Sequence, residues 1–213
     1  MGRRALRKVD PALDLSRHFR EATDLPTQFD VQSLFGRPAP LEVEVGSGKG
    51  LFLSAASRAN PDHNFFGIEI ARKYARYAAA RLAKQESTNA LMISGDALLL
   101  FRQWFPANSL AAIHIYFPDP WWKKRHKKRR VMNEDFLHDV ERTLVSGGRL
   151  HFWTDVEEYF QTTLALIAQT VKLDGPLSVS EKPAEHDLDY RTHFDRRTRQ
   201  SELPVYRAEF KNG

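Results

Sequence analysis

The residues best placed to do chemistry lie between positions 117 and 130. Asp119 stands between Pro118 and Pro120 in the run Phe-Pro-Asp-Pro-Trp-Trp. Each proline fixes its own φ and restricts the residue before it to extended conformations, so two local constraints hold the aspartate. Constraint of this kind is costly for an incidental loop acid. We therefore expect Asp119 to act on a bound ligand.

A cationic strip follows this aspartate directly. Residues 123–130 contain seven Lys and Arg, which we expect to track the phosphates of a nucleic acid. Trp121 and Trp122 precede the strip, and each can either stack on a base or anchor the loop in the core. A nuclear-import signal has a similar composition, but such a signal needs to be exposed, whereas this strip emerges beside Asp119.

A second group of residues has the pattern of a cofactor site. Gly46, Gly48 and Gly50 form a Gly-x-Gly-x-Gly turn after an apolar strand, where backbone N–H groups can approach a ligand. Glu69, about 20 residues on, can bond both hydroxyls of a ribose. Asp96 can accept from an adenine amino group, or it can serve only as a helix N-cap.

The ligand of this turn follows from its spacing and charge. A dinucleotide fingerprint places its third glycine one residue later than this turn does. Glu44, just before the turn, disfavours a pyrophosphate and suits a ligand that carries an ammonium and a sulfonium. We interpret the site as one for S-adenosylmethionine, and we expect no metal.

Short apolar runs alternate with helical patterns along the chain, which predicts an α/β fold. We expect a doubly wound, mostly parallel, seven-stranded sheet of the Rossmann-like methyltransferase type, closed by an antiparallel C-terminal strand, with ligands at the carboxyl ends of its strands. Residues 172–202 have a loop-rich pattern. In a helix after the second strand, Ile70, Tyr74 and Leu82 fall on one face. Strands are expected at residues 41–45, 64–69, 90–93, 111–117, 149–153 and 205–210.

Composition limits the class of protein. The 213 residues suffice for one buried domain, and the absence of cysteine excludes disulfides and a thiol nucleophile. No window approaches the roughly 20 apolar residues of a membrane span, so we expect a cytoplasmic protein. The net charge of +5 is unevenly spread, because residues 1–8, 123–130 and 191–199 hold the basic excess and the remainder is acidic. We expect residues 1–40 to form a partly disordered basic arm or lid and residues 41–213 to form the enzymatic domain.

The segment from Phe117 to Arg130 resembles the signature of the tRNA (guanine-N7-)-methyltransferases. The resemblance extends over most of residues 41–210, through Glu44-Val45-Gly46-Ser47-Gly48, Gly67-Ile68-Glu69, Gly95-Asp96-Ala97, Thr154-Asp155 and Thr192-His193-Phe194-Asp195. The resemblance implies cofactor contacts from Glu44, Gly46, Gly48, Glu69, Asp96 and Asp119. It further implies that Asp119 is the catalytic acid, and that tRNA is bound by Lys123, Asp155, Thr192, His193, Phe194 and Asp195.

Three residues depart from the family pattern. Trp122 stands where Pro is usual, Asp195 replaces a more common Glu, and Glu202 stands where Gly is typical. The resemblance implies methyl transfer to N7 of a guanine in the tRNA variable loop. Alternatives are an RNA methyltransferase acting on another base atom, a non-catalytic RNA-binding protein of the same fold, and a nicotinamide oxidoreductase. The sequence leaves the choice between monomer and homodimer open.

Overall fold

The computed structural model describes residue 6, residues 8–179 and residues 192–213, without the side chains of Lys124, Lys127, His193 and Arg197. The described strands are β1 (Phe19–Glu21), β2 (Leu41–Val45), β3 (Asn64–Glu69), β4 (Ala90–Ser94), β5 (Leu110–Tyr116), β6 (Leu144–Thr154), β7 (Leu173–Leu177) and β8 (Tyr206–Asn212). The described α-helices are α1 (Val31–Phe35), α2 (Leu51–Ala59), α3 (Arg72–Lys84), α4 (Ala97–Gln103), α5 (Glu134–Thr143), α6 (Glu157–Thr170) and α7 (His193–Gln200). Two short 3₁₀ helices are η1 (Ala22–Asp24) and η2 (Lys124–Arg129).

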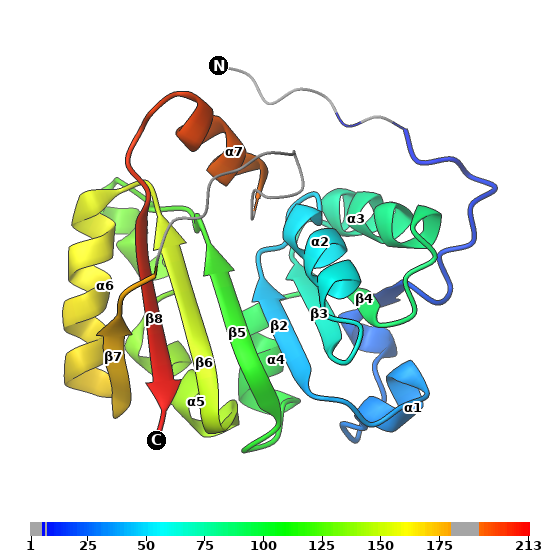
Figure 1. Ribbon diagram of the computed structural model, residues 1–213, viewed down its shortest axis with the longest axis horizontal. Coiled ribbons are helices and arrows are strands. Elements are labelled where there is room, and N and C mark those ends of the chain that lie inside the picture. The colour runs from blue at the N-terminus through cyan, green and yellow to red at the C-terminus, as the bar shows by residue number, and fades with distance from the viewer. Residues whose placement is uncertain (1–5, 7, 180–191) are drawn as a thin grey trace.

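These strands form one sheet in the order β1-β4-β3-β2-β5-β6-β8-β7 (Figure 1). The pairs from β1 to β6 are parallel, and β8 runs antiparallel to both β6 and β7. The predicted α/β fold with an antiparallel closing strand is confirmed. The described sheet has eight strands rather than the expected seven.

Helices cover both faces of the parallel part of the sheet, with α2 and α3 in front of it and α4 and α5 behind it in Figure 1. Strand β4 is buried along its whole length, as is expected of a parallel strand covered on both faces. One buried cluster lies on the α2 and α3 side and includes Phe52 and Leu82. The other includes Phe101, Phe136 and Tyr159 from α4, α5 and α6. Apolar packing therefore holds the sheet in place from both faces.

The order of the strands reverses between β2 and β5. From β2 the chain continues outward to β3 and β4, whereas β5 and β6 lie on the other side of β2. Val45 at the end of β2 pairs with Ile115 near the end of β5. The loops that leave these two strands therefore start side by side, and this reversal is where open α/β sheets bind their ligands.

Residues 8–40 contribute a strand, β1, to the sheet. Strand β1 pairs with β4 through Phe19 and Met92, and the Met92 N–H also bonds the carbonyl of His18 at 2.9 Å. A division at residue 40 between an arm and a domain remains a prediction. Within the described ranges, none of the helices has the length and apolar character to cross a membrane.

Candidate active site

The turn between β2 and α2 consists largely of left-handed backbone. Gly46, Gly48 and Gly50 have φ values of 79°, 53° and 66°, which side-chain-bearing residues rarely adopt. At Gly50 a Cβ would also lie 2.6 Å from the Cβ of Ala78, so glycine lets α2 approach α3. The Gly46 N–H bonds the carbonyl of Ile68 at 2.8 Å and ties the turn to β3. The turn thus has the open backbone predicted for a ligand cradle.

Glu69 connects this turn to the next helix. Its Oε2 accepts from the Gly48 N–H at 2.9 Å, and its Oε1 accepts from the Ala71 N–H at 2.9 Å. The side chain is only half-buried, so lone pairs of both oxygens can still reach a ligand. The carboxylate therefore lies at the cradle, where a ribose-binding acid is expected.

Glu44 is a buried acid beneath the same turn. It is 3% exposed, and within the described part of the chain its Oε2 finds no hydrogen-bond partner. Burial raises the pKa of Glu44 to about 8, with the Glu69 charge adding to the rise and the Ser47 hydroxyl opposing it. A cationic ligand group beside this buried carboxyl group would stabilise its ionised form.

Asp96 follows β4 at the same edge of the sheet. It is the N-cap of α4, and its Oδ1 accepts from the Leu98 N–H at 2.9 Å. The Gly95 N–H bonds the Glu69 carbonyl at 3.2 Å, which places Asp96 beside the end of β3. The N-cap alternative is therefore realised, but it uses one oxygen of an exposed carboxylate.

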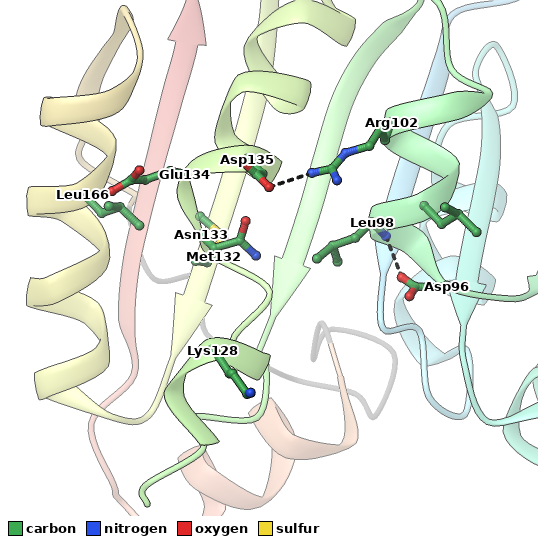
Figure 2. A pocket seen from close by; sticks show the side chains of 10 residues that line it. Asp96, Leu98, Arg102, Lys128, Met132, Asn133, Glu134, Asp135 and Leu166 are labelled. Atoms are coloured by element: carbon green, nitrogen blue, oxygen red, sulfur yellow. Dashed lines mark hydrogen bonds and ion pairs between the residues drawn. The ribbon is translucent and has the colours of Figure 1, made fainter. Parts of the chain in front are cut away.

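A cleft of about 670 Å³ lies beside Asp96, between α4 and α5. Figure 2 shows Asp96 and Leu98 on one side and Lys128 of η2 below, while a dashed line marks the Arg102–Asp135 ion pair above. Leu98, Met132 and Leu166 supply apolar wall, and Lys128 supplies positive charge. A residue predicted for the cofactor, Asp96, and a member of the basic segment, Lys128, therefore line the same cleft.

Asp119 lies in the loop that leaves β5, and this loop starts beside the glycine turn across the strand reversal. Its side chain is exposed, and its Oδ1 accepts from the Trp121 N–H at 3.0 Å. Phe117 and Trp121 on either side have positive φ values of 51° and 46°. The Phe117 N–H bonds the Trp153 carbonyl at 2.8 Å, which fixes the loop to β6. Phe117 precedes Pro118 and is left-handed rather than extended, so the prolines do not account for this part of the loop, which costs free energy to form.

The two tryptophans have different environments. Trp121 is half-buried, and its ring contacts Arg129 at 5.1 Å and His126 at 5.7 Å. Trp122 is 64% exposed. Trp121 therefore anchors the loop to the basic segment, whereas Trp122 leaves its ring accessible to a base.

The side chains of the basic segment, residues 123–130, differ in their exposure to solvent. Its described side chains at Lys123, Arg125, Lys128 and Arg129 are exposed, as phosphate-binding groups must be. Arg130 is buried at 9% exposure, and its Nε donates to the Pro120 carbonyl at 2.8 Å. The expectation that all seven cations track phosphates is therefore wrong for Arg130. Sequence alone could not separate it from its neighbours, because all seven belong to one cationic run.

Helix α7 lies above the carboxyl ends of β5 and β6 in Figure 1. Thr192 Oγ1 accepts from the N–H groups of Phe194 and Asp195 at 3.1 and 3.0 Å. The exposed ring of Phe194 stacks on Phe117 with centroids 6.3 Å apart. This stack brings α7 to the Asp119 loop, although the side chain of His193 lies outside the described part.

Asp195 and Asp155 differ in accessibility. Asp195 is fully buried, whereas Asp155 is exposed directly after the end of β6. Tyr116 pairs with Trp153 in the sheet, so Asp155 emerges close to the Asp119 loop. Of these two predicted RNA-binding residues, Asp155 is the one whose side chain can reach a substrate directly. Among the described residues, no group of three or more His, Asp or Glu could hold a metal ion.

Comparisons with known proteins concern both the sequence and the fold. Residues 38–208 match a protein family described as "Putative methyltransferase". The tRNA (guanine-N(7)-)-methyltransferase of Rhodopirellula baltica is 52% identical, covering 99% of this chain and 80% of that protein. The protein of the same description from Listeria innocua is 34% identical over 84% of each chain.

Among solved structures, a 16S rRNA methyltransferase is similar in fold. It has 14% sequence identity and a TM-score of 0.62, and the match covers 85% of this chain and 92% of that chain. At this identity the likeness concerns the architecture alone.

Proposed function

Because this chain belongs to the tRNA (guanine-N(7)-)-methyltransferase family, we propose that it transfers the methyl group of S-adenosylmethionine to N7 of a guanine in the tRNA variable loop. The observation that carries the proposal is the meeting of two loops at the strand reversal. The glycine turn after β2 and the Asp119 loop after β5 start from paired strands. A cofactor and a base bound there would be neighbours.

The residues at the glycine turn fit S-adenosylmethionine. Glu44 offers a buried oxygen without a described partner, which suits the positive charge of the ligand. Glu69 would accept from the ribose hydroxyls, and Asp96 would accept from the adenine amino group. Gly46 and Gly48 leave room for the ligand above the turn, since a Cβ at Gly46 would meet nothing within 4 Å.

Methyl transfer to guanine N7 requires that the base and the cofactor be positioned, and it does not require proton transfer. The bound cofactor supplies an electrophilic methyl group on a sulfonium. Guanine N7 is an unprotonated acceptor at neutral pH, so it needs no general base. Asp119 would accept from a guanine N–H and orient the base, since alignment at near-contact distance supplies much of the rate. Its carboxylate would also stabilise the positive charge that develops on the purine ring.

The RNA must present its target outside a regular helix. The major groove of A-form RNA is too deep and narrow to expose N7 to an enzyme, and a variable loop avoids this barrier. Lys123 and Asp155, both exposed at the sheet edge, would contact the RNA together with the first turn of α7. Within that turn, Thr192, His193 and Phe194 would contact the RNA, and the buried Asp195 would support them from beneath.

We propose further that the enzyme works in the cytoplasm as a monomer or homodimer. We also propose that residues 1–40 form an arm or lid for the substrate and residues 41–213 the catalytic domain. Removal of residues 1–8, which contain four cations, should weaken tRNA binding without lowering the rate at saturation.

The test is to incubate the purified protein with methyl-labelled S-adenosylmethionine and a tRNA transcript, and then to identify the labelled nucleoside. We expect 7-methylguanosine, and none when the variable-loop guanine is replaced by adenine. Asp119→Asn, of nearly the same size, should lower turnover by about two orders of magnitude. Label on another base atom, or near-normal turnover of Asp119→Asn, would contradict the proposal.

A further inference from the structure

We propose that Arg130 is a positioning residue that holds the Asp119 carboxylate through the peptide bond between Pro120 and Trp121. The inference rests on the proposed function, because it assigns a role in the same methyl transfer. The carbonyl of this peptide accepts from Arg130 Nε at 2.8 Å. The N–H of the same peptide donates to Asp119 Oδ1 at 3.0 Å. One rigid plane therefore connects the two side chains.

The connection is electrostatic as well as geometric. A peptide unit is planar and dipolar, so a cation at its oxygen polarises it and strengthens its N–H as a donor. That N–H points at the negative charge of Asp119. Arg130 therefore favours one orientation of the carboxylate and helps to hold Trp121 at its strained φ of 46°.

Arg130 is itself anchored from two helices. Its guanidinium lies 4.5 Å from the ring centroid of Tyr159 in α6. Its backbone carbonyl accepts from Asn133 Nδ2 at 3.1 Å, and Asn133 caps α5 by accepting from the Phe136 N–H at 3.0 Å. Arg130 therefore links the position of Asp119 to helices α5 and α6.

The burial of Arg130 argues against a role in binding phosphate. An RNA phosphate cannot reach a guanidinium of 9% exposure as it could reach the exposed Arg125 or Lys128. Its Nη2 is buried without a hydrogen-bond partner among the described residues, which is costly for a charged group. A residue that merely filled this space could be apolar. The charge is explained if it acts on the peptide that orients Asp119.

The experiment compares Arg130→Met with Arg125→Met, a matched loss of one cation from the same segment. Methionine keeps the contact with Tyr159 but loses the donor. We expect Arg130→Met to lower the single-turnover rate at saturating tRNA and cofactor by about 10- to 100-fold. Its Kd for tRNA, the salt dependence of that Kd and its Kd for S-adenosylmethionine should stay within about twofold. Arg125→Met should weaken tRNA binding and reduce the salt slope by about one.

A double mutant tests the route of the effect. Because Arg130 acts through Asp119, Arg130→Met combined with Asp119→Asn should be no slower than Asp119→Asn alone. Additive losses would overturn the proposal, as would a normal rate in Arg130→Met or a tRNA-binding defect like that of Arg125→Met. If Arg130→Met fails to fold, Arg130→Lys takes its place in the test. Its ammonium can still donate to the Pro120 carbonyl, so it should keep part of the wild-type single-turnover rate. A wild-type protein that makes no 7-methylguanosine would instead refute the proposed function.

Discussion

Glu69 and Gly48 are joined across the glycine turn by a hydrogen bond of 2.9 Å from the Gly48 N–H to Oε2. The other oxygen of Glu69 holds the start of α3 through the Ala71 N–H. The carboxylate that we propose for ribose binding is thereby oriented by backbone N–H groups on both sides. Such preorganisation reduces the ordering cost of binding.

Replacing Glu69 by alanine should therefore weaken cofactor binding strongly. The loss of charge-assisted hydrogen bonds, worth about 1.5–3 kcal/mol, predicts a Kd for S-adenosylmethionine raised by roughly 10- to 100-fold. Calorimetric titration would measure it. Asp174→Ala, which removes an exposed acid from β7, is the matched control and should leave the Kd unchanged. An unaltered Kd in Glu69→Ala would remove this residue from the cofactor site.

Glu202 has a left-handed backbone at the C-terminal end of α7. Its φ is 54°, its N–H bonds the Arg199 carbonyl at 3.1 Å, and the Leu203 N–H bonds the Thr198 carbonyl at 2.9 Å. This pair of bonds is a Schellman motif, whose left-handed position favours glycine. We predict that Glu202→Gly stabilises the protein by about 0.5–1 kcal/mol, since relief of strain exceeds the added entropy of the unfolded chain.

Urea unfolding followed by circular dichroism would measure that gain. Glu202→Ala is the control, because alanine removes the same carboxylate but keeps the Cβ and its strain, and it should give little gain. Equal effects of glycine and alanine would show that the charge rather than the backbone limits stability at this position.

The strands that position the site were predictable because their signals are local. Val43 and Val45 form an apolar strand, Gly46 and Gly48 end it, and the prolines beside Asp119 restrict the loop after β5. The gathering of the acids that follow these strands was also predictable, since parallel strands end at one edge of a sheet. Local patterns thus predicted both the architecture and the edge that carries the candidate site.

The features that sequence missed depend on tertiary contacts. Strand β1 has only three half-buried residues and exists because the edge of β4 accepts it. Strand β7 contains Gly175 and Pro176, which normally argue against a strand, but it lies at the sheet edge. Ile70 was predicted to share one helical face with Tyr74 and Leu82, but it precedes α3, which begins at Arg72, and it is 74% exposed. The burial of Arg130 has the same origin, since only the fold places Tyr159 beneath it.

Trp122 should bind RNA by stacking on an unpaired base. It is 64% exposed and adjoins the exposed cation Lys123. Base stacking on an aromatic ring contributes about 1–3 kcal/mol, so Trp122→Ala should weaken tRNA binding by roughly 5- to 100-fold, whereas Trp122→Phe should keep most of the affinity. Fluorescence anisotropy at several salt concentrations would measure both.

The salt dependence distinguishes stacking from other causes. Loss of a stacking ring removes no phosphate contact, so the slope of log Kd against log salt should be the same in Trp122→Ala and wild type. Leu177→Ala, an exposed apolar residue on the edge strand β7, should bind tRNA normally. Unchanged affinity in Trp122→Ala would exclude the stacking role.

Glu44 should make cofactor binding depend on pH. Burial first, and the Glu69 charge second, raise its pKa from 4.5 to about 8. The folded protein therefore holds a proton that the unfolded chain has lost, and without ligand its stability should fall as pH rises from 4.5 to about 8. A cationic ligand favours the ionised form, so affinity for S-adenosylmethionine should rise between about pH 6 and 7.5, by up to about tenfold per pH unit, with proton release. Calorimetry in buffers of different ionisation enthalpy measures the affinity at each pH and the proton release. Glu44→Gln should abolish the pH dependence of the affinity and the proton release. A wild-type affinity independent of pH would mean that the ligand does not use this carboxylate.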